Sequence, residues 1–202
     1  MNDVNSPSFW EQSYRSGRTG WDLGMPTPVF QRLAESAVFK PGKMLVICAG
    51  RGHDARLFAR LGFEVTAVDF AEEAVQEMQA LDDPHASMEI IQADLFDLPA
   101  FMEEEFDYIL EYTCFCAIDP QRRVDYINSV TSLLKPGGVY IALAFPIGGR
   151  SGGPPYVVTP DELVDPLVDS GFELISRNVP EDSVPGRQGI EELLILKKKS
   201  TS

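Results

Sequence analysis

Short apolar segments alternate along the chain with segments of helical periodicity, and this alternation constrains the fold more than any other feature. The segments suited to buried strands are MLVICAG at 44–50, EVTAVD at 64–69, and residues 88–92, 106–112 and 139–145. Helices are expected between them, over 54–61, 71–81 and 121–134. Because each helix returns the chain to the same edge of a sheet, this order predicts parallel strands.

The last part of the chain breaks the alternation. After a helix expected over 160–170, the strand-like segments FELISRNV and ELLILKK are separated only by a polar stretch that contains Pro185 and Gly186. That connection is too short for a crossover helix, so the two strands should be antiparallel. We therefore expect a Rossmann-like α/β fold with a seven-stranded, mostly parallel sheet, an antiparallel last strand and helices on both faces.

The length of 202 residues predicts a single domain over 1–202, because little chain is left for a second core. No apolar run approaches the roughly 18 residues of a membrane span, and the N-terminus does not resemble a secretory signal. We therefore expect no membrane association and a cytoplasmic location. Cys48, Cys114 and Cys116 are expected to be reduced thiols in that compartment.

The formal net charge of -14 argues against a nucleic-acid partner, because nucleic-acid affinity rests on cationic contacts to phosphate. The basic run 197–199 is interpreted as a solvated tail. The Cys-x-Cys spacing at 114–116 and the two histidines form no plausible metal cluster, so no metal is expected. We expect a small-molecule partner, and a protein that is a monomer or a weak oligomer.

A glycine loop, CAGRG at 48–52, lies between the first expected strand and its helix, where glycine lets the backbone turn tightly and approach a ligand. Asp69 ends the second strand, where such folds hydrogen-bond ribose hydroxyls. A nicotinamide-dependent dehydrogenase would carry the same two features. Two later motifs separate the possibilities: ADLF at 93–96 offers a carboxylate near an adenine, and LLKPGG at 133–138 turns from a helix directly into a strand.

This ordered series resembles the motifs of class I S-adenosylmethionine (SAM) dependent methyltransferases. More specific motifs are WEQSY at 10–14, GWDLG at 20–24 with Thr27-Pro28, GHD at 52–54, FCAIDP at 115–120 with Arg123, FP at 145–146 and GGPPY at 152–156. They resemble the thiopurine S-methyltransferase family, and especially its halide and thiol methyltransferase branch, over residues 9–197. The resemblance implies SAM as the cofactor and S-adenosylhomocysteine as its product.

The resemblance also implies roles for the matching residues. Those implied to hold SAM are Trp10, Tyr14, Trp21, Cys48, Gly50, Gly52, Asp69, Phe70, Asp94, Leu95, Glu111 and Tyr112. The aromatic residues would belong to an N-terminal helical lid of about residues 1–37, and the glycine loop would support the methionine end of SAM. The implied acceptor pocket contains Arg123, Phe145 and Tyr156, with Arg123 and Tyr156 as the catalytic residues.

Two positions depart from the family pattern. Cys48 stands where the family usually begins its loop with glycine. Phe145 stands where close relatives among the halide enzymes carry tyrosine, and the missing hydroxyl weakens an assignment to halide.

Methyl transfer from a sulfonium to an anion is an in-line displacement that depends on alignment and on exclusion of water. An anion that enters a protein of net charge -14 needs a local cation, for which Arg123 is the expected residue. The leading hypothesis is methylation of a small thiol, hydrosulfide, thiocyanate or halide. The alternatives are a methyltransferase for a selenium, tellurium, oxygen or nitrogen acceptor, and a SAM-binding module without turnover.

Overall fold

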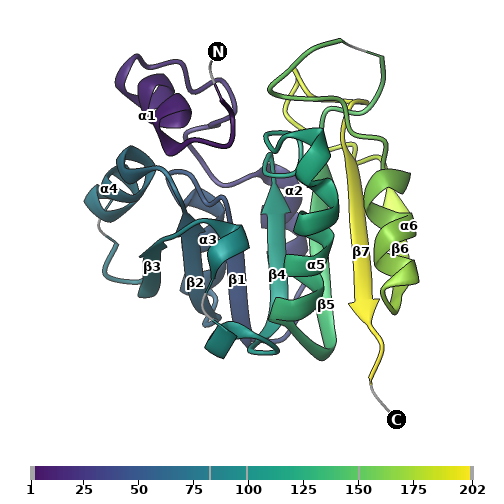
Figure 1. Ribbon diagram of the computed structural model, residues 1–202. Coiled ribbons are helices and arrows are strands. Elements are labelled where there is room, and N and C mark those ends of the chain that lie inside the picture. The colour runs from purple at the N-terminus through teal and green to yellow at the C-terminus, as the bar shows by residue number, and fades with distance from the viewer. Residues whose placement is uncertain (1–2, 82, 99, 150, 201–202) are drawn as a thin grey trace.

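The structure, a computed structural model, describes residues 3–81, 83–98, 100–149 and 151–200. Within them, one seven-stranded sheet has the strand order β3-β2-β1-β4-β5-β7-β6 (Figure 1). The strands are β1 (Lys43–Ile47), β2 (Glu64–Asp69), β3 (Met88–Gln92), β4 (Phe106–Tyr112), β5 (Leu134–Ala144), β6 (Phe172–Asn178) and β7 (Glu192–Lys198). β7 is antiparallel to β5 and β6, and the remaining neighbours pair in parallel. The predicted fold, including its reversed last strand, is confirmed.

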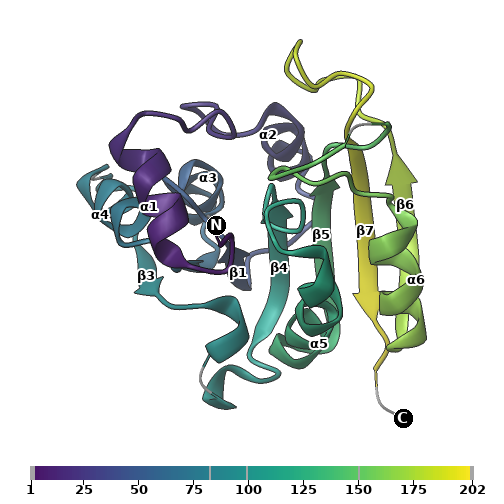
Figure 2. The same cartoon turned by 45° about the horizontal axis from the view of Figure 1, so that its top comes forward.

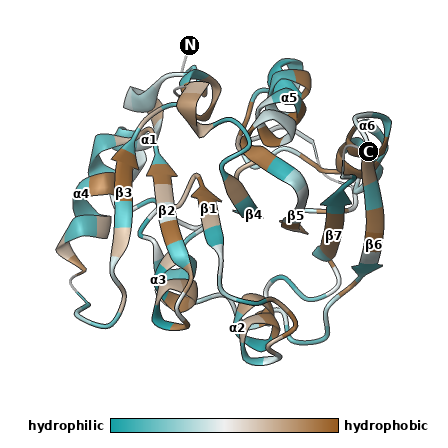
Figure 3. Cartoon of the chain, turned by 90° about the horizontal axis from the view of Figure 1, so that it is seen from below, coloured by the Kyte–Doolittle hydropathy of each residue, from teal (hydrophilic) through white to brown (hydrophobic). Residues whose placement is uncertain are grey.

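Helices cover both faces of this sheet, and one of them, the first, lies above its carboxyl edge (Figures 1 and 2). They are α1 (Pro7–Arg15), α2 (Pro28–Glu35), α3 (His53–Arg60), α4 (Glu72–Ala80), α5 (Arg123–Leu133) and α6 (Asp161–Asp169). Figure 3 shows α2 and α3 on one face and α5 and α6 on the other. Pro28 begins α2, where a residue without an N–H group breaks no helical hydrogen bond.

The central strand β1 is buried on both faces. Met44 and Val46 belong to the hydrophobic cluster that includes α2 and α3, whereas Leu45 and Ile47 belong to the cluster that includes α5 and α6. Full burial of one such side chain stabilises the fold by about 1.5–3 kcal/mol. The two clusters therefore hold the ends of the parallel strands in fixed positions.

Two segments from opposite ends of the chain lie above the carboxyl edge of the sheet. Figures 1 and 2 show α1 and the connection between β6 and β7 above this edge. The connection lies there because β6 runs in the same direction as β5 and ends at the same edge. Among the described residues, no helix combines the length and apolar character that crossing a membrane requires.

Two strand boundaries differ from the sequence prediction by more than one residue. β1 ends at Ile47 rather than at Gly50, because Cys48 has a φ of +48° and leaves the extended conformation. β5 begins at Leu134, which pairs with Phe106 before the turn at Gly137 is complete. The structure thus includes the LKPGG segment in the strand, where the sequence predicts a turn.

Candidate active site

A cavity of about 770 Å³ lies over the carboxyl ends of the parallel strands. Its lining includes Cys48 and Gly50 after β1, Asp69 at the end of β2, and Asp94 after β3. β2 and β4 flank β1 at the point where the strand order reverses, which is the usual binding crevice of open α/β sheets. The cavity volume lies within the range of small-molecule and cofactor sites.

Three aromatic residues of the N-terminal segment also line this cavity. Trp21 packs edge-on against both Trp10 and Tyr14, with ring centroids 5.5 and 5.6 Å apart. The indole nitrogen of Trp10 donates a hydrogen bond of 2.9 Å to the carbonyl oxygen of Val4. We use the word lid for residues 7–22, which carry these rings over the strand ends.

The lid is attached to the α/β domain by charged side chains. Arg51 of the glycine loop donates hydrogen bonds to the carboxylates of Asp22 in the lid and Glu77 in α4. Arg187, from the connection between β6 and β7, donates to the carbonyl oxygens of Gly20 at 3.3 Å and Trp21 at 2.8 Å. Both ends of the chain therefore help to close the cavity.

Asp69 organises the glycine loop. Its carboxylate accepts hydrogen bonds from the backbone N–H groups of Gly50 at 2.9 Å and Ala71 at 3.0 Å. Burial raises the pKa of this carboxyl, against the lowering effect of these hydrogen bonds. Gly50 has a φ of +56°, and a Cβ atom there would lie 3.3 Å from the Tyr14 hydroxyl. A side chain at this position would crowd the space between the loop and the lid.

A second polar group lies after β3. The Asp94 carboxylate accepts a hydrogen bond of 3.0 Å from the Phe96 N–H group and so caps a short 3-10 turn, Leu95–Asp97. The guanidinium of Arg122 lies 3.7 Å from the centroid of the Phe96 ring. Asp94, Phe96 and Arg122 all line the cavity.

Arg187 and Phe145 form a different part of the lining. The Arg187 side chain is only 8% exposed, and its guanidinium lies 4.8 Å from the Phe145 ring centroid and 5.1 Å from that of Tyr112. It donates a hydrogen bond to the Tyr112 hydroxyl, and its Nη1 lies 4.0 Å from the buried Glu191 carboxylate. This part of the cavity therefore combines a buried cation with aromatic walls.

Comparison with known proteins decides the family. The family model described as Thiopurine S-methyltransferase (TPMT) matches residues 5–192. The chain belongs to the thiopurine S-methyltransferase family. Its chemistry is therefore that of a SAM-dependent methyltransferase, as the motifs predicted.

Relatives agree with this assignment, and a solved structure shares the fold. The chain is 40% identical to Probable thiol methyltransferase 2 of Arabidopsis thaliana, over 98% of this chain and 88% of the relative. It is 35% identical to Thiocyanate methyltransferase 1 of Brassica oleracea, over 91% and 82%. A Burkholderia thailandensis 1,6-didemethyltoxoflavin-N1-methyltransferase, solved with bound S-adenosylhomocysteine, shares the fold with a TM-score of 0.73 and 22% identity, over 96% of this chain and 87% of that chain.

The described residues of this methyltransferase fit SAM. The Asp69 carboxylate accepts backbone hydrogen bonds on both oxygens, and a lone pair that these bonds do not use would be available to a ribose hydroxyl. The aromatic lid suits a cationic sulfonium, and the Asp94 carboxylate in the lining would be available to the adenine amino group. When bound, SAM supplies a methyl group on a positively charged sulfur.

Many of the residues that the family resemblance implied come together at the cavity. Those that line it are Trp10, Tyr14, Trp21, Cys48, Gly50, Asp69, Phe70, Asp94, Leu95 and Phe145. The implied residues outside this lining are Gly52, Glu111, Tyr112, Arg123 and Tyr156.

Arg123 and Tyr156, the expected catalytic residues, point elsewhere. Arg123 donates to the Glu162 carboxylate at 2.7 Å and to the Val157 carbonyl oxygen at 2.9 Å, and its guanidinium packs over the Phe115 ring. The Tyr156 ring folds back so closely that a Cβ on Gly153 would lie 2.4 Å from it. Both residues therefore contact the loop before α6, and neither belongs to the cavity lining.

The other three outlying residues have structural contacts. A Cβ atom at Gly52 would lie 2.7 Å from the Met78 side chain, so this glycine leaves room for Met78 of α4 beside the start of α3. The Glu111 carboxylate turns inward and accepts hydrogen bonds from the N–H groups of Cys114 at 2.9 Å and Phe115 at 3.0 Å. The Tyr112 hydroxyl donates to Glu191 behind the cavity wall.

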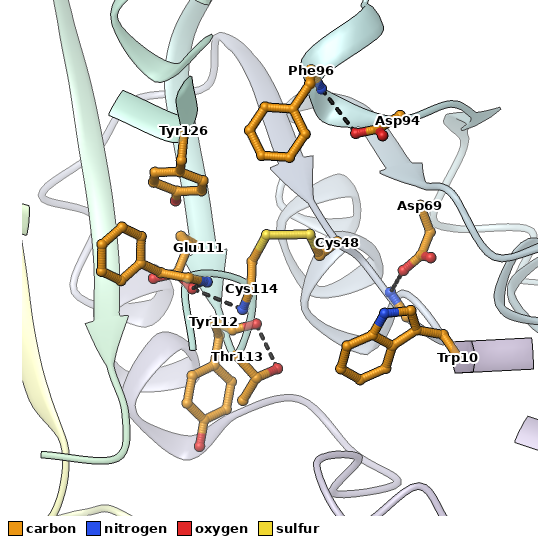
Figure 4. Close-up of a disulfide and its surroundings, with 12 residues drawn as sticks. Trp10, Cys48, Asp69, Asp94, Phe96, Glu111, Tyr112, Thr113, Cys114 and Tyr126 are labelled. Atoms are coloured by element: carbon orange, nitrogen blue, oxygen red, sulfur yellow. Dashed lines mark hydrogen bonds between the residues drawn. A yellow bond between two sulfur atoms is a disulfide. The ribbon is translucent and has the colours of Figure 1, made fainter. Parts of the chain in front are cut away.

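The expectation of three reduced thiols is wrong for two of the cysteines. Cys48 and Cys114 form a disulfide with their Cα atoms 5.5 Å apart (Figure 4). The two residues are distant in sequence, but β1 and β4 are neighbours and end side by side. Cys116 is a free, buried thiol, and burial raises its pKa well above the ordinary value.

Sequence reasoning missed Arg187, although a signal was present. The last two strands were expected to be antiparallel. With β7 reversed, β6 runs in the same direction as β5 and ends at the ligand-binding edge of the sheet. A polar connection after such a strand must lie near the site, and Arg187 is the cation within it.

Proposed function

We propose that this SAM-dependent methyltransferase methylates a small sulfur nucleophile, either a thiol, hydrosulfide or thiocyanate, and that heavier halides are secondary acceptors. The products are the methylated acceptor and S-adenosylhomocysteine. The observation that carries the proposal is the buried Arg187 guanidinium next to Phe145 in the cavity lining. The names of the Arabidopsis and Brassica relatives, thiol and thiocyanate methyltransferases, support the same class of acceptor.

The proposed chemistry needs alignment more than acid–base catalysis. A thiolate, thiocyanate or halide is already an anion, so no proton has to move while its bond to the methyl carbon forms. The lid rings and Phe145 exclude water from the nucleophile, which makes a weakly hydrated anion more reactive. Trp10, Tyr14 and Trp21 attract the sulfonium, with a cation–π energy of about 0.5–2 kcal/mol for each well-placed ring.

Arg187 takes the role that the sequence prediction gave to Arg123. Its guanidinium borders the cavity, and the N–H groups left after the hydrogen bonds to the lid carbonyls and to Tyr112 can hold an anion. Glu191 at 4.0 Å balances part of this charge, so the site favours a small monoanion over a multiply charged substrate. For a thiol acceptor, the cation lowers the pKa of the bound thiol and favours its thiolate.

An acceptor panel tests this proposal. The protein is incubated with SAM and, separately, with methanethiol, hydrosulfide, thiocyanate, iodide, selenite and a catechol, and S-adenosylhomocysteine is measured. We expect the sulfur acceptors to give the largest kcat/KM, with iodide measurably lower. Turnover confined to the selenium or oxygen acceptor would support another small-molecule methyltransferase, and SAM binding without turnover on any acceptor would support a binding module.

A further inference from the structure

The Cys48–Cys114 disulfide lies in the wall of the cavity. Both cysteines belong to the lining. In Figure 4 the disulfide lies in the middle, with Asp69 and Asp94 on one side of it and Glu111 on the other. Cys48 is exposed, whereas Cys114 is fully buried. A small reagent inside the cavity can therefore reach the bond at the Cys48 sulfur.

The bond links two functional segments. Cys48 begins the glycine loop that continues to Gly50, and Cys114 begins the segment that carries Cys116 and Ile118 into the lining. The N–H group of Cys114 is fixed by Glu111, so the second segment is anchored beside the disulfide. The oxidised protein thus has a covalent tie between the wall expected to hold SAM and the wall near the acceptor.

We propose that this disulfide is a modification site, reduced from within the cavity by small thiols of the same class as the methyl acceptor. The choice of thiol rests on the proposed function. A cavity that admits a thiolate to the methyl group of SAM also admits it to Cys48, because Cys48 borders the same space. A thiol acceptor would thus react with this protein in two ways: it accepts the methyl group of SAM, and it reduces the disulfide.

The exchange balances without any other reactant. A thiolate attacks the Cys48 sulfur, the bond between Cys48 and Cys114 breaks, and the Cys114 thiolate leaves and takes a proton. A second thiolate attacks the small-molecule sulfur of the mixed disulfide and releases Cys48 as a thiolate, which is also protonated. Two thiols are oxidised to one small disulfide, and the protein disulfide is reduced to two thiols.

Occupancy of the cavity should control this reaction. A ligand that covers the glycine loop also covers Cys48, so S-adenosylhomocysteine should protect the disulfide. A bulky thiol should be slower than a small one for the same reason, once its thiolate fraction is taken into account.

The test follows disulfide reduction in the full-length protein without SAM. Protein oxidised in air is mixed with 2-mercaptoethanol or with glutathione, quenched with N-ethylmaleimide, and analysed by intact mass and peptide mapping. Each rate is divided by the rate of the same thiolate with a small soluble disulfide. We expect the corrected rate of 2-mercaptoethanol to exceed that of glutathione at least fivefold, and saturating S-adenosylhomocysteine to slow it at least tenfold.

Three results would overturn the proposal: no linked Cys48–Cys114 peptide in the oxidised protein, equal corrected rates for the two thiols, or no protection by S-adenosylhomocysteine. A Cys116→Ser variant is the matched control, because it removes the free thiol and keeps the pair. Its protection and size selectivity should equal those of the wild type, and their loss would assign the labelling to Cys116. The readout does not depend on methyl transfer, so failure here is distinguishable from failure of the acceptor panel.

Discussion

At the scale of single residues, the arginines Arg123 and Arg187 have different surroundings. Arg123 lies outside the lining, and its two Nη atoms donate to the Glu162 carboxylate and to the Val157 carbonyl oxygen. Arg187 is slightly more deeply buried than Arg123, but its guanidinium borders the cavity and packs over Phe145. The position of a cation within the fold, and not its presence in a family motif, determines whether it can meet an anionic acceptor.

Replacing Arg187 with alanine should lower kcat/KM for thiocyanate by about 10- to 100-fold, since a hydrogen bond to a charged group contributes about 1.5–3 kcal/mol. Arg187→Lys keeps the charge but loses the planar fork, so its kcat/KM for thiocyanate should lie between that of Arg187→Ala and that of the wild type. Initial rates of S-adenosylhomocysteine release measure the effect, with SAM affinity determined separately by calorimetry because Arg187 also contacts the lid. Arg123→Ala is the matched control, and a larger loss in that control would contradict the role of Arg187.

The buried carboxyl of Glu111 should make the stability of the protein depend on pH. Burial raises the pKa of this carboxyl to about 7, although the N–H groups of Phe115 and Cys114 favour its charged form. The folded pKa of Glu111 is higher than its unfolded pKa. Its contribution to the unfolding free energy is therefore complete below about pH 4.5 and is lost as the pH rises through about 7.

Glu111→Gln mimics the protonated form and should remove this dependence. Between pH 5 and pH 8.5 the unfolding free energy of the wild type should fall by about 2–3 kcal/mol relative to the variant. Urea unfolding at the two pH values measures the difference, and the exposed Glu103→Gln serves as control. A wild-type stability that rises relative to Glu111→Gln over this range would show that the sign is wrong.

At the scale of elements, the lid is a short segment that cannot be stable alone. α1 has nine residues, fewer than an isolated helix needs in water, so its position depends on contacts with the domain. Arg51 joins Asp22 in the lid to Glu77 in α4, and the side chains of Arg51 and Asp22 are only 23% and 13% exposed. This partly buried pair should be worth more than a surface ion pair.

Arg51→Ala should therefore loosen the lid without unfolding the sheet. We expect hydrogen–deuterium exchange in residues 7–22 to become at least tenfold faster and SAM binding to weaken, while exchange in β1 and β4 stays at the wild-type rate. Arg60→Ala, which breaks the ion pair between the half-exposed Arg60 side chain and Asp83, is the matched control and should leave the lid unchanged. Faster exchange throughout the sheet of Arg51→Ala would instead indicate a global loss of stability.

The sequence also predicts elements better than it predicts side-chain directions. β2, β3 and β4 have the predicted boundaries, because apolar runs bounded by polar residues define a strand locally. The direction of Arg123 depends on Glu162, and the pairing of Cys48 with Cys114 depends on the adjacency of β1 and β4. Such contacts join residues far apart in the chain, so no local pattern reveals them.

At the scale of the whole molecule, the net charge of -14 should act oppositely on the two substrates. SAM carries a net positive charge and is attracted by this field, whereas thiocyanate is repelled, and salt screens both effects. Raising the ionic strength from about 10 to 150 mM with sodium acetate should weaken SAM binding and raise kcat/KM for thiocyanate, each by roughly two- to fivefold. Calorimetry and initial rates measure the two quantities, and a change in the same direction for both would contradict control by the global field.

Transfer of a labelled methyl group tests the central claim most directly. The protein is incubated in sealed vials with SAM that carries a trideuterated methyl group and with methanethiol, and both products are quantified by mass spectrometry. We expect equal amounts of S-adenosylhomocysteine and of dimethyl sulfide with one trideuterated methyl group, at a rate that depends on the protein and on the thiol. Release of S-adenosylhomocysteine without the labelled sulfide, or no release above the protein-free rate, would contradict a thiol methyltransferase.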